Sequence, residues 1–156
     1  KNITKKLNIF ILLLFLILIF LQISIGAFVS GMDAGKIFNS WPLMGNSYFP
    51  DDNNLNNLFE FAALSDPSLV QFIHRNLAYL IGAFYVLILY KVYINKMHDL
   101  YESINYLGLF IILQIILGIF TVLYGAQIFV ASMHQISSIF LVSSSIYFFY
   151  LNTEIN

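Results

Sequence analysis

Two histidines occupy matching places in long apolar stretches of the sequence. His74 lies in VQFIHR, five residues after one such stretch begins at Leu69, and His134 lies in ASMHQ, six residues after another begins at Ile128. A neutral imidazole is a common metal ligand. The chain contains no cysteine, which excludes thiolate metal sites and thiol catalysis. The histidine pair therefore points to a metal centre with nitrogen ligands.

Four apolar segments must position these histidines. Of the 156 residues, 60% are hydrophobic and 10% are charged, and the formal net charge is −1 with only seven Lys and Arg. These values exclude a disordered chain, a soluble domain and a nucleic-acid binder. Each segment reaches the roughly 20 residues that a helix needs to cross a bilayer. The sequence predicts one all-α integral membrane domain, residues 1–156, a four-helix bundle with spans at about 7–29, 69–90, 104–124 and 128–151.

The first and third segments carry the same short motif. LQISIGAFVSG aligns with LQIILGIFTVL, which matches Gln22 with Gln114. The same alignment matches Gly26 with Gly118, and in each case one of the two histidines follows in the next segment. The chain is therefore predicted to be two pseudo-repeated helical hairpins, the first with a long outer loop at 30–68. Internal repeats of this kind commonly place a functional site at their interface.

The lysines set the predicted orientation. Five lie before the first span or between the second and third, whereas the outer loop offers only Lys36. Because Lys and Arg stay preferentially on the cytoplasmic side, both termini are expected on the cytoplasmic or matrix side. The first apolar run is longer than the core of a signal peptide, which favours a retained span. The five lysines are Lys1, Lys5, Lys6, Lys91 and Lys96.

Equal depth favours one group shared by the two histidines. At about 1.5 Å per residue, each lies roughly 8–10 Å below the outer hydrocarbon boundary. Haem is the natural candidate because it is largely apolar and accepts two axial histidines. A bare Zn or Cu ion would need further ligands at that depth. The alternative is that each histidine bonds a backbone carbonyl or a serine across the bundle, and His98 in the inner loop is expected to be solvated.

Arg75 follows His74 directly and is the only arginine. Two roles are open, forked hydrogen bonds to a haem propionate or snorkelling to lipid phosphate, and the neighbouring histidine favours the propionate. Gln71 shares the face of His74 and either lines the pocket or bonds another helix. The spans hold no Ser/His/Asp set and no carboxylate that could act as a base, so cofactor binding is favoured over catalysis. Aromatic residues of the outer loop are expected at the membrane interface, namely Trp41, Tyr48 and Phe49.

Together these motifs resemble a known family. The C-terminal half of haem A synthase, of the mitochondrial and α-proteobacterial type, has segments similar to GAFVSGMDAGKIFNSWPLMG, VQFIHRNLAYLIG, LQIILGIFTVL and ASMHQ. The resemblance covers about residues 26–144. It implies one half of a duplicated eight-helix protein of the bacterial or mitochondrial inner membrane, in which each half is a four-helix bundle with a histidine pair.

The resemblance also implies a function. The family oxidises a methyl group of haem O to the formyl group of haem A for cytochrome c oxidase. His74 and His134 would be the axial iron ligands of a haem b that relays electrons. In the family's N-terminal half a glutamate stands three residues before the histidine, where this chain has Gln71, and that half is absent. The chain is then expected to be a C-terminal fragment or one product of a split enzyme, and catalysis would require the partner half.

Partners follow from the same resemblance. Membrane lipid would surround the helices, haem O would bind through the N-terminal half, and a donor of unknown identity would supply electrons. Haem O synthase, oxidase assembly factors and a second copy of the chain are further expected partners. Two other interpretations stay open. One is a free-standing bis-His electron-transfer cytochrome, and the other is a non-catalytic membrane assembly or transport subunit with structural histidines.

Overall fold

The computed structural model describes residues 6–154 and is helical in its regular structure, apart from one isolated bridge between Met44 and Ser47. The predicted four-helix bundle is confirmed, and all four helices are long and apolar enough to cross a membrane. Lys1 and Lys5, which contributed to the predicted orientation, lie outside the described residues. The elements are α1 (Ile9–Gly31), η1 (Ala34–Lys36), η2 (Leu55–Phe59), η3 (Phe61–Ser65), α2 (Pro67–Ile94), η4 (His98–Leu100), α3 (Tyr101–Leu123) and α4 (Ile128–Glu154).

Local sequence explains where the helices begin. The side chain of Asn8 accepts a hydrogen bond from the backbone N–H of Phe10 and caps α1. Asp66 caps α2 by accepting from the N–H of Leu69 at 2.9 Å, and Pro67 occupies the first turn, where its missing N–H costs nothing. α2 therefore starts before its apolar run and also continues past it, which explains why it is longer than the predicted span.

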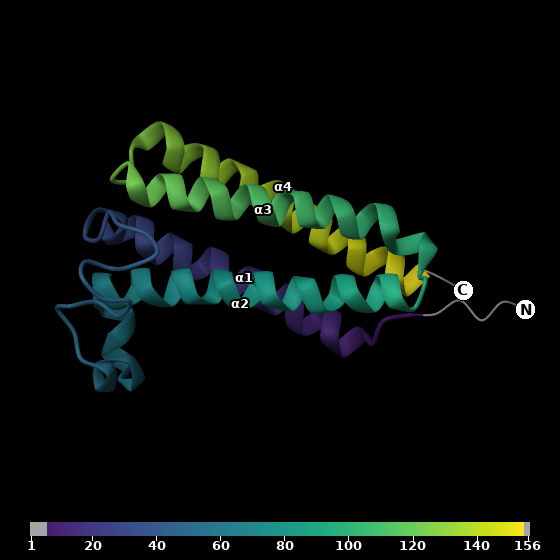
Figure 1. Ribbon diagram of the computed structural model, residues 1–156, viewed down its shortest axis with the longest axis horizontal. Coiled ribbons are helices and arrows are strands. Elements are labelled where there is room, and N and C mark those ends of the chain that lie inside the picture. Colours follow the sequence, from purple (N-terminus) through teal and green to yellow (C-terminus); the bar gives the residue numbers. More distant parts are fainter. Residues whose placement is uncertain (1–5, 155–156) are drawn as a thin grey trace, which may run out of the picture.

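The helices pair as two hairpins, α1 with α2 and α3 with α4 (Figure 1). α1 also contacts α4, and α2 also contacts α3, so α2 and α4 lie diagonally across the bundle. The loop at 32–66 lies at one end of the bundle, and the start of α1 and the end of α4 lie at the other (Figure 1). The two histidine-bearing helices thus face each other across the interface between the hairpins.

The apolar core fills the inner half of the bundle, the half remote from the outer loop. Asn152 closes this end, because its side chain accepts from the N–H of Leu7 at 2.8 Å and donates to the Leu7 carbonyl at 3.1 Å. The Tyr85 hydroxyl donates to the Ile104 carbonyl over Gly108, where any Cβ would collide with it. The buried core consists of Leu7, Leu12, Phe15, Ile19, Ile81, Tyr85, Ile88, Val92, Met97, Leu100, Ile104, Leu107, Ile111, Leu141 and Phe148.

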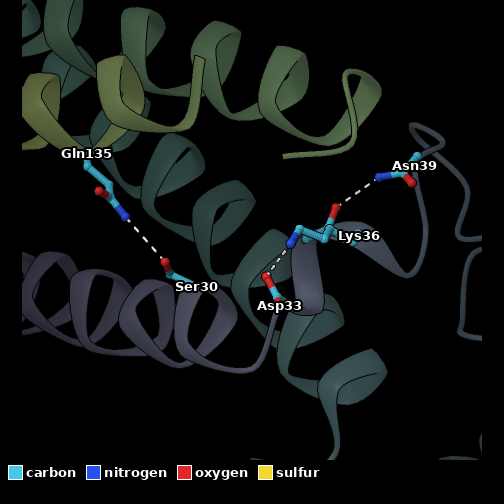
Figure 2. Close-up of polar contacts among 6 residues, drawn as sticks. Ser30, Asp33, Lys36, Asn39 and Gln135 are labelled. Atoms are coloured by element: carbon cyan, nitrogen blue, oxygen red, sulfur yellow. Dashed lines mark hydrogen bonds and ion pairs between the residues drawn. The ribbon is translucent and has the colours of Figure 1, made fainter. Parts of the chain in front are cut away.

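Polar contacts tie the outer ends of the two hairpins together. Gln135 of α4 donates to the Ser30 hydroxyl of α1 at 3.5 Å (Figure 2). Asn39 of the outer loop donates to the carbonyl of Gly35 at 2.9 Å, which Figure 2 shows, and to the Val122 carbonyl of α3 at 3.0 Å. The outer loop therefore contacts both hairpins, although it belongs to the first.

Candidate functional site

In the first hairpin, a glutamine and a glycine of α1 hold the turn of α2 that carries His74. The side-chain amide of Gln22 donates to the His74 carbonyl at 3.1 Å, and its nitrogen also lies 3.3 Å from Nε2 of the His74 ring. One turn along α1, a Cβ at Gly26 would lie 3.1 Å from Cε1 of His74. Such a contact is tighter than ordinary packing allows, so the ring occupies space that only glycine leaves free.

The second hairpin repeats this arrangement. The side-chain amide of Gln114 donates to the His134 carbonyl at 3.1 Å and also bonds the Ser137 hydroxyl. A Cβ at Gly118 would lie 3.3 Å from Cε1 of His134. The internal repeat predicted from the sequence is therefore confirmed in three dimensions. Its unit is a glutamine, a glycine one turn later, and a histidine on the following helix.

Five buried polar atoms lack a protein partner among the described residues. Two of them are the Nδ1 atoms of His74 and His134, one in each repeat. Unpaired polar atoms are costly inside a bilayer, where no water is available to bond them. The two matching Nδ1 atoms therefore receive no hydrogen-bond partner from the described residues of the chain. The other three atoms are Oε1 of Gln22, Oε1 of Gln71 and Nε of Arg75.

In α1, α3 and α4 the buried residues stop short of the level of the histidines, whereas α2 buries Leu69 and Val70 outward of His74. In α1 the last buried residue is Ile19, and in α3 it is Ile111, so neither helix buries a side chain in its outer part. In α4 the outermost buried residue is Ser137. A well-packed bundle would carry interlocking side chains here as it does at the inner end. The side chains of α1, α3 and α4 are therefore less fully buried at their outer ends than at their inner ends.

Arg75 is bound to the outer loop. One terminal nitrogen donates to the carbonyls of Ser40 at 2.9 Å and Leu43 at 3.3 Å, and the other donates to that of Phe38 at 2.9 Å. The side chain is only 8% exposed, so it does not snorkel to the headgroups. Gln71 donates to the same Phe38 carbonyl at 3.1 Å. The predicted pairing of Arg75 with a propionate stays a prediction, since only its Nε lacks a partner in the chain.

Aromatic loop residues expected at the membrane interface contact α2, and their place at the interface stays a prediction. The indole N–H of Trp41 donates to the Tyr79 hydroxyl at 2.8 Å, and the Tyr48 hydroxyl donates to the side chain of Asn76 at 2.6 Å. The rings of Tyr48 and Phe49 both pack edge-on against Phe72, with centroid separations of 5.7 and 5.0 Å. These contacts were not foreseen from the sequence, because each joins residues far apart in the chain without a repeated spacing.

His98 lies at the opposite end of the molecule, in η4, where it is exposed as predicted. Within residues 6–154 no group of three or more His, Asp or Glu side chains is placed to hold a metal ion. A bare metal ion would therefore have too few ligands from these residues. A metal whose equatorial ligands come with the cofactor needs only the two histidines.

Comparison with known proteins places the chain in a family. The model of the cytochrome oxidase assembly protein family matches residues 2–146. The chain belongs to this family. It is 40% identical over 154 residues to the "Heme A synthase" of Pelagibacter ubique, an alignment that covers 99% of this chain and 45% of that protein. It is 39% identical over 135 residues to the "Heme A synthase" of Rickettsia felis, covering 85% of this chain and 39% of that protein.

A third relative, the "Heme A synthase" of Rickettsia prowazekii, is 37% identical over 136 residues, which cover 85% of this chain and 40% of the relative. The predicted resemblance to haem A synthase is thus confirmed. The chain spans less than half the length of these curated relatives. No solved structure shows a significant match to it.

Proposed function

We propose that this chain is the haem-binding C-terminal half of a haem A synthase, and that His74 and His134 are the axial ligands of a haem b. The observation that carries the proposal is the matched pair of buried Nδ1 atoms without a protein partner, one in each repeat. The family match and the relatives named "Heme A synthase" support the enzyme class. When bound, the haem would supply one-electron transfer to a substrate site on the N-terminal half.

Each residue of the repeat has a defined part in this proposal. The two histidines would hold the iron from α2 and α4, which lie diagonally across the bundle. Gly26 and Gly118 leave room for the imidazole rings. Gln22 and Gln114 fix the helical turns that carry the rings by bonding their carbonyls. The outer loop, held on α2, excludes water from the outer end of the site.

An optical and electron paramagnetic resonance spectrum of the freshly isolated chain tests haem binding. We expect a low-spin, six-coordinate haem that is lost in both His74→Ala and His134→Ala. His98→Ala is the matched control and keeps the spectrum, because His98 is exposed at the other end of the bundle. Absence of haem from the freshly isolated protein, or retention of the six-coordinate signal in either site variant, contradicts the proposal.

The enzymatic part has a separate test. The chain is produced together with the N-terminal half of the Pelagibacter ubique relative, and conversion of haem O to haem A is followed by chromatography of the extracted haem. We expect turnover with both halves present and none with either alone. Haem binding without turnover in the combined preparation would favour the free-standing electron-transfer cytochrome instead.

The proposal includes an orientation with the ends of the chain and the α2–α3 connection on the cytoplasmic or matrix side. Among the described residues, Lys6, Lys91 and Lys96 lie at this end and Lys36 at the other. The chain has no cysteine, so single cysteines report sidedness directly. In intact cells, a membrane-impermeant maleimide should label Asn46→Cys and spare Lys96→Cys, and the reverse pattern contradicts the orientation.

A further inference from the structure

An apolar patch projects from the outer loop beside the start of α2. Its four side chains are all exposed. The two rings are the most exposed, Phe59 at 87% and Phe61 at 94%. They flank Glu60, so apolar and charged groups alternate along a short stretch. The patch, called here the Phe59–Phe61 patch, consists of Leu55, Phe59, Phe61 and Leu64 of η2 and η3.

Hydrogen bonds fix this patch to the first turn of α2. Asn57 of η2 donates to the side chain of Asn53 at 3.1 Å, and Asn53 donates to Asp66 at 3.3 Å. The same carboxylate oxygen of Asp66 accepts from the N–H of Leu69 in α2. Ser68 adds a hydrogen bond of 2.6 Å to Asp52. The exposed rings therefore have a defined height relative to a membrane-spanning helix.

The patch lies next to the outer end of a helix that is long and apolar enough to cross a membrane. η3 ends at Ser65, and α2 begins two residues later at Pro67. Figure 1 shows η2 and η3 extending sideways from the outer end of α2, across the long axis of the bundle and on the side away from α3 and α4. A segment placed in this way can lie along the surface of a bilayer that α2 crosses.

The geometry points to lipid as the occupant of the patch. We propose that the Phe59–Phe61 patch inserts into the interfacial region of the outer leaflet and anchors the outer loop there. Aromatic side chains favour this region, and an apolar face can bury several ångströms into the headgroup and acyl boundary. The loop is acidic, with Asp51, Asp52, Glu60 and Asp66, so anionic lipid is not attracted and the insertion depends on apolar burial in zwitterionic lipid.

The lack of cysteine allows a direct test by spin labelling. Phe59→Cys and Phe61→Cys are labelled separately in the full chain, reconstituted in phosphatidylcholine vesicles. Accessibility is then measured to oxygen, which concentrates in lipid, and to a nickel chelate, which stays in water. Leu80→Cys, at an exposed position in the middle of α2, is the lipid-facing control, and Asn46→Cys of the outer loop is the water-facing control.

We expect the ratio of oxygen to nickel accessibility at both patch positions to exceed that of Asn46→Cys several-fold and to approach that of Leu80→Cys. A ratio like that of Asn46→Cys overturns the proposal, because the patch is then in water. Low accessibility to both reagents also overturns it, since a protein surface such as a second copy then covers the patch. These positions are exposed, so the labels leave the fold intact.

A second variant tests the apolar contribution. A label at Leu55→Cys is compared in the unchanged chain and in one that also carries Phe59→Ser and Phe61→Ser. The proposal expects the label to shift towards water when both rings are removed. An unchanged ratio overturns it. Replacing half of the phosphatidylcholine by phosphatidylglycerol should not deepen the label, and deeper insertion in that lipid would overturn the assignment to apolar burial.

Discussion

Both hairpins carry a glutamine, a glycine and a histidine at matching positions, but different connections join their helices at the outer end. In the first, Gln22 and His74 are 52 residues apart and a long loop lies between them, whereas in the second Gln114 and His134 are 20 residues apart and a tight turn suffices. The repeated part is the support of the histidines. The part found in one hairpin alone is the loop and the arginine that holds it.

Placing the imidazoles and holding the outer loop are therefore separate roles of different residues in the bundle. The glutamine, glycine and histidine of each hairpin place an imidazole, and their near-identical contact distances show that the task is the same in both. Arg75 has no counterpart in α4, because Gln135 follows His134 and reaches only the Ser30 hydroxyl at 3.5 Å. Substitutions in the two hairpins should therefore have matched effects at the repeated residues and unmatched effects at the loop.

The largest effect is expected from Arg75→Met, which removes the loop clamp of the first hairpin. Three hydrogen bonds from the guanidinium to loop carbonyls are lost. Bonds from charged groups are strong, so we expect a loss of about 2–3 kcal/mol in the free energy of unfolding. Hydrogen exchange of the backbone amides in 34–44 should accelerate, and the fluorescence of Trp41, the only tryptophan, should change.

The control for this variant is Lys36→Met, whose ion pair with Asp33 is exposed and should contribute under about 1 kcal/mol (Figure 2). Exchange in α3 and α4 should stay unchanged in Arg75→Met. If the loop amides keep their protection while haem is lost, Arg75 serves a propionate and not the loop.

The sequence predicts those features that a pattern of residue types marks, and misses contacts that have no such pattern. The four spans were located within a few residues, because apolar runs report the part of a helix that lies in hydrocarbon. The ends were less accurate, since caps such as Asp66 extend α2 beyond that part. The repeat matched Gln22 with Gln114 and placed one histidine after each, but the hydrogen bond from each glutamine to its histidine carbonyl was not predicted.

The binding of Arg75 to the loop could not be inferred in the same way. Its acceptors are backbone carbonyls 32 to 37 residues away, and a carbonyl carries no signature of residue type. The same holds for the contact of Trp41 with Tyr79, where tyrosine and tryptophan also fit a membrane interface. The sequence therefore indicated the repeated residues and missed the loop contacts of Arg75 and Trp41, which occur only once.

The next largest effect on stability is expected from Gly26→Ala and Gly118→Ala. A Cβ at Gly26 or Gly118 presses on the imidazole at 3.1 or 3.3 Å. Overpacking costs about 1–3 kcal/mol, and the better helix propensity of alanine offsets up to about 1 kcal/mol of it. Thermal unfolding should show a loss in both variants, larger for Gly26→Ala. Gly82→Ala, where the nearest side-chain atom is at an ordinary 3.8 Å, should be neutral or stabilising.

Losses in both site variants would fit the repeat, and a stabilised Gly26→Ala would contradict it, because the ring would then have space to spare. A loss in one hairpin without a loss in the other would show that only one of the two imidazoles is held against its glycine.

Gln22→Leu and Gln114→Leu test the matched hydrogen bonds. Each loses a bond to a histidine carbonyl, and bonds between membrane helices average about 0.6 kcal/mol, so small and similar losses in stability are expected. The second partner differs, since Gln22 also lies 3.3 Å from the His74 ring nitrogen and Gln114 bonds Ser137. Imidazole nitrogen NMR should therefore report a change at His74 in Gln22→Leu and little at His134 in Gln114→Leu.

The control for this pair is Gln135→Leu, since Gln135 lies in α4 next to His134 and is exposed. It should leave both imidazole signals in place. A matching change at both histidines in the two site variants would mean that the glutamines contact the rings equally and that the asymmetry is absent.

The smallest effect concerns Asp51 in the outer loop, which has no equivalent in the second hairpin. The backbone N–H of Asn46 and the Ser47 hydroxyl both donate to its carboxylate, which lowers the pKa of Asp51 from the ordinary 3.8. Gly45, at a φ of 81°, provides the turn that brings these donors to it. Because the folded pKa is the lower one, ionised Asp51 stabilises the loop above pH 3.8, and this contribution is lost as pH falls through the folded pKa.

Lowering the pH from about 5 through the folded pKa of Asp51 should then loosen the loop, which the fluorescence of Trp41 reports. Asp51→Asn cannot ionise, so it should remove this pH dependence and give the acid signal throughout. The carboxylate is fully exposed, and a small amplitude is expected for that reason. A transition of unchanged size in Asp51→Asn would assign the acid sensitivity to another group, whereas its disappearance would confine it to the loop of the first hairpin, which the second hairpin lacks.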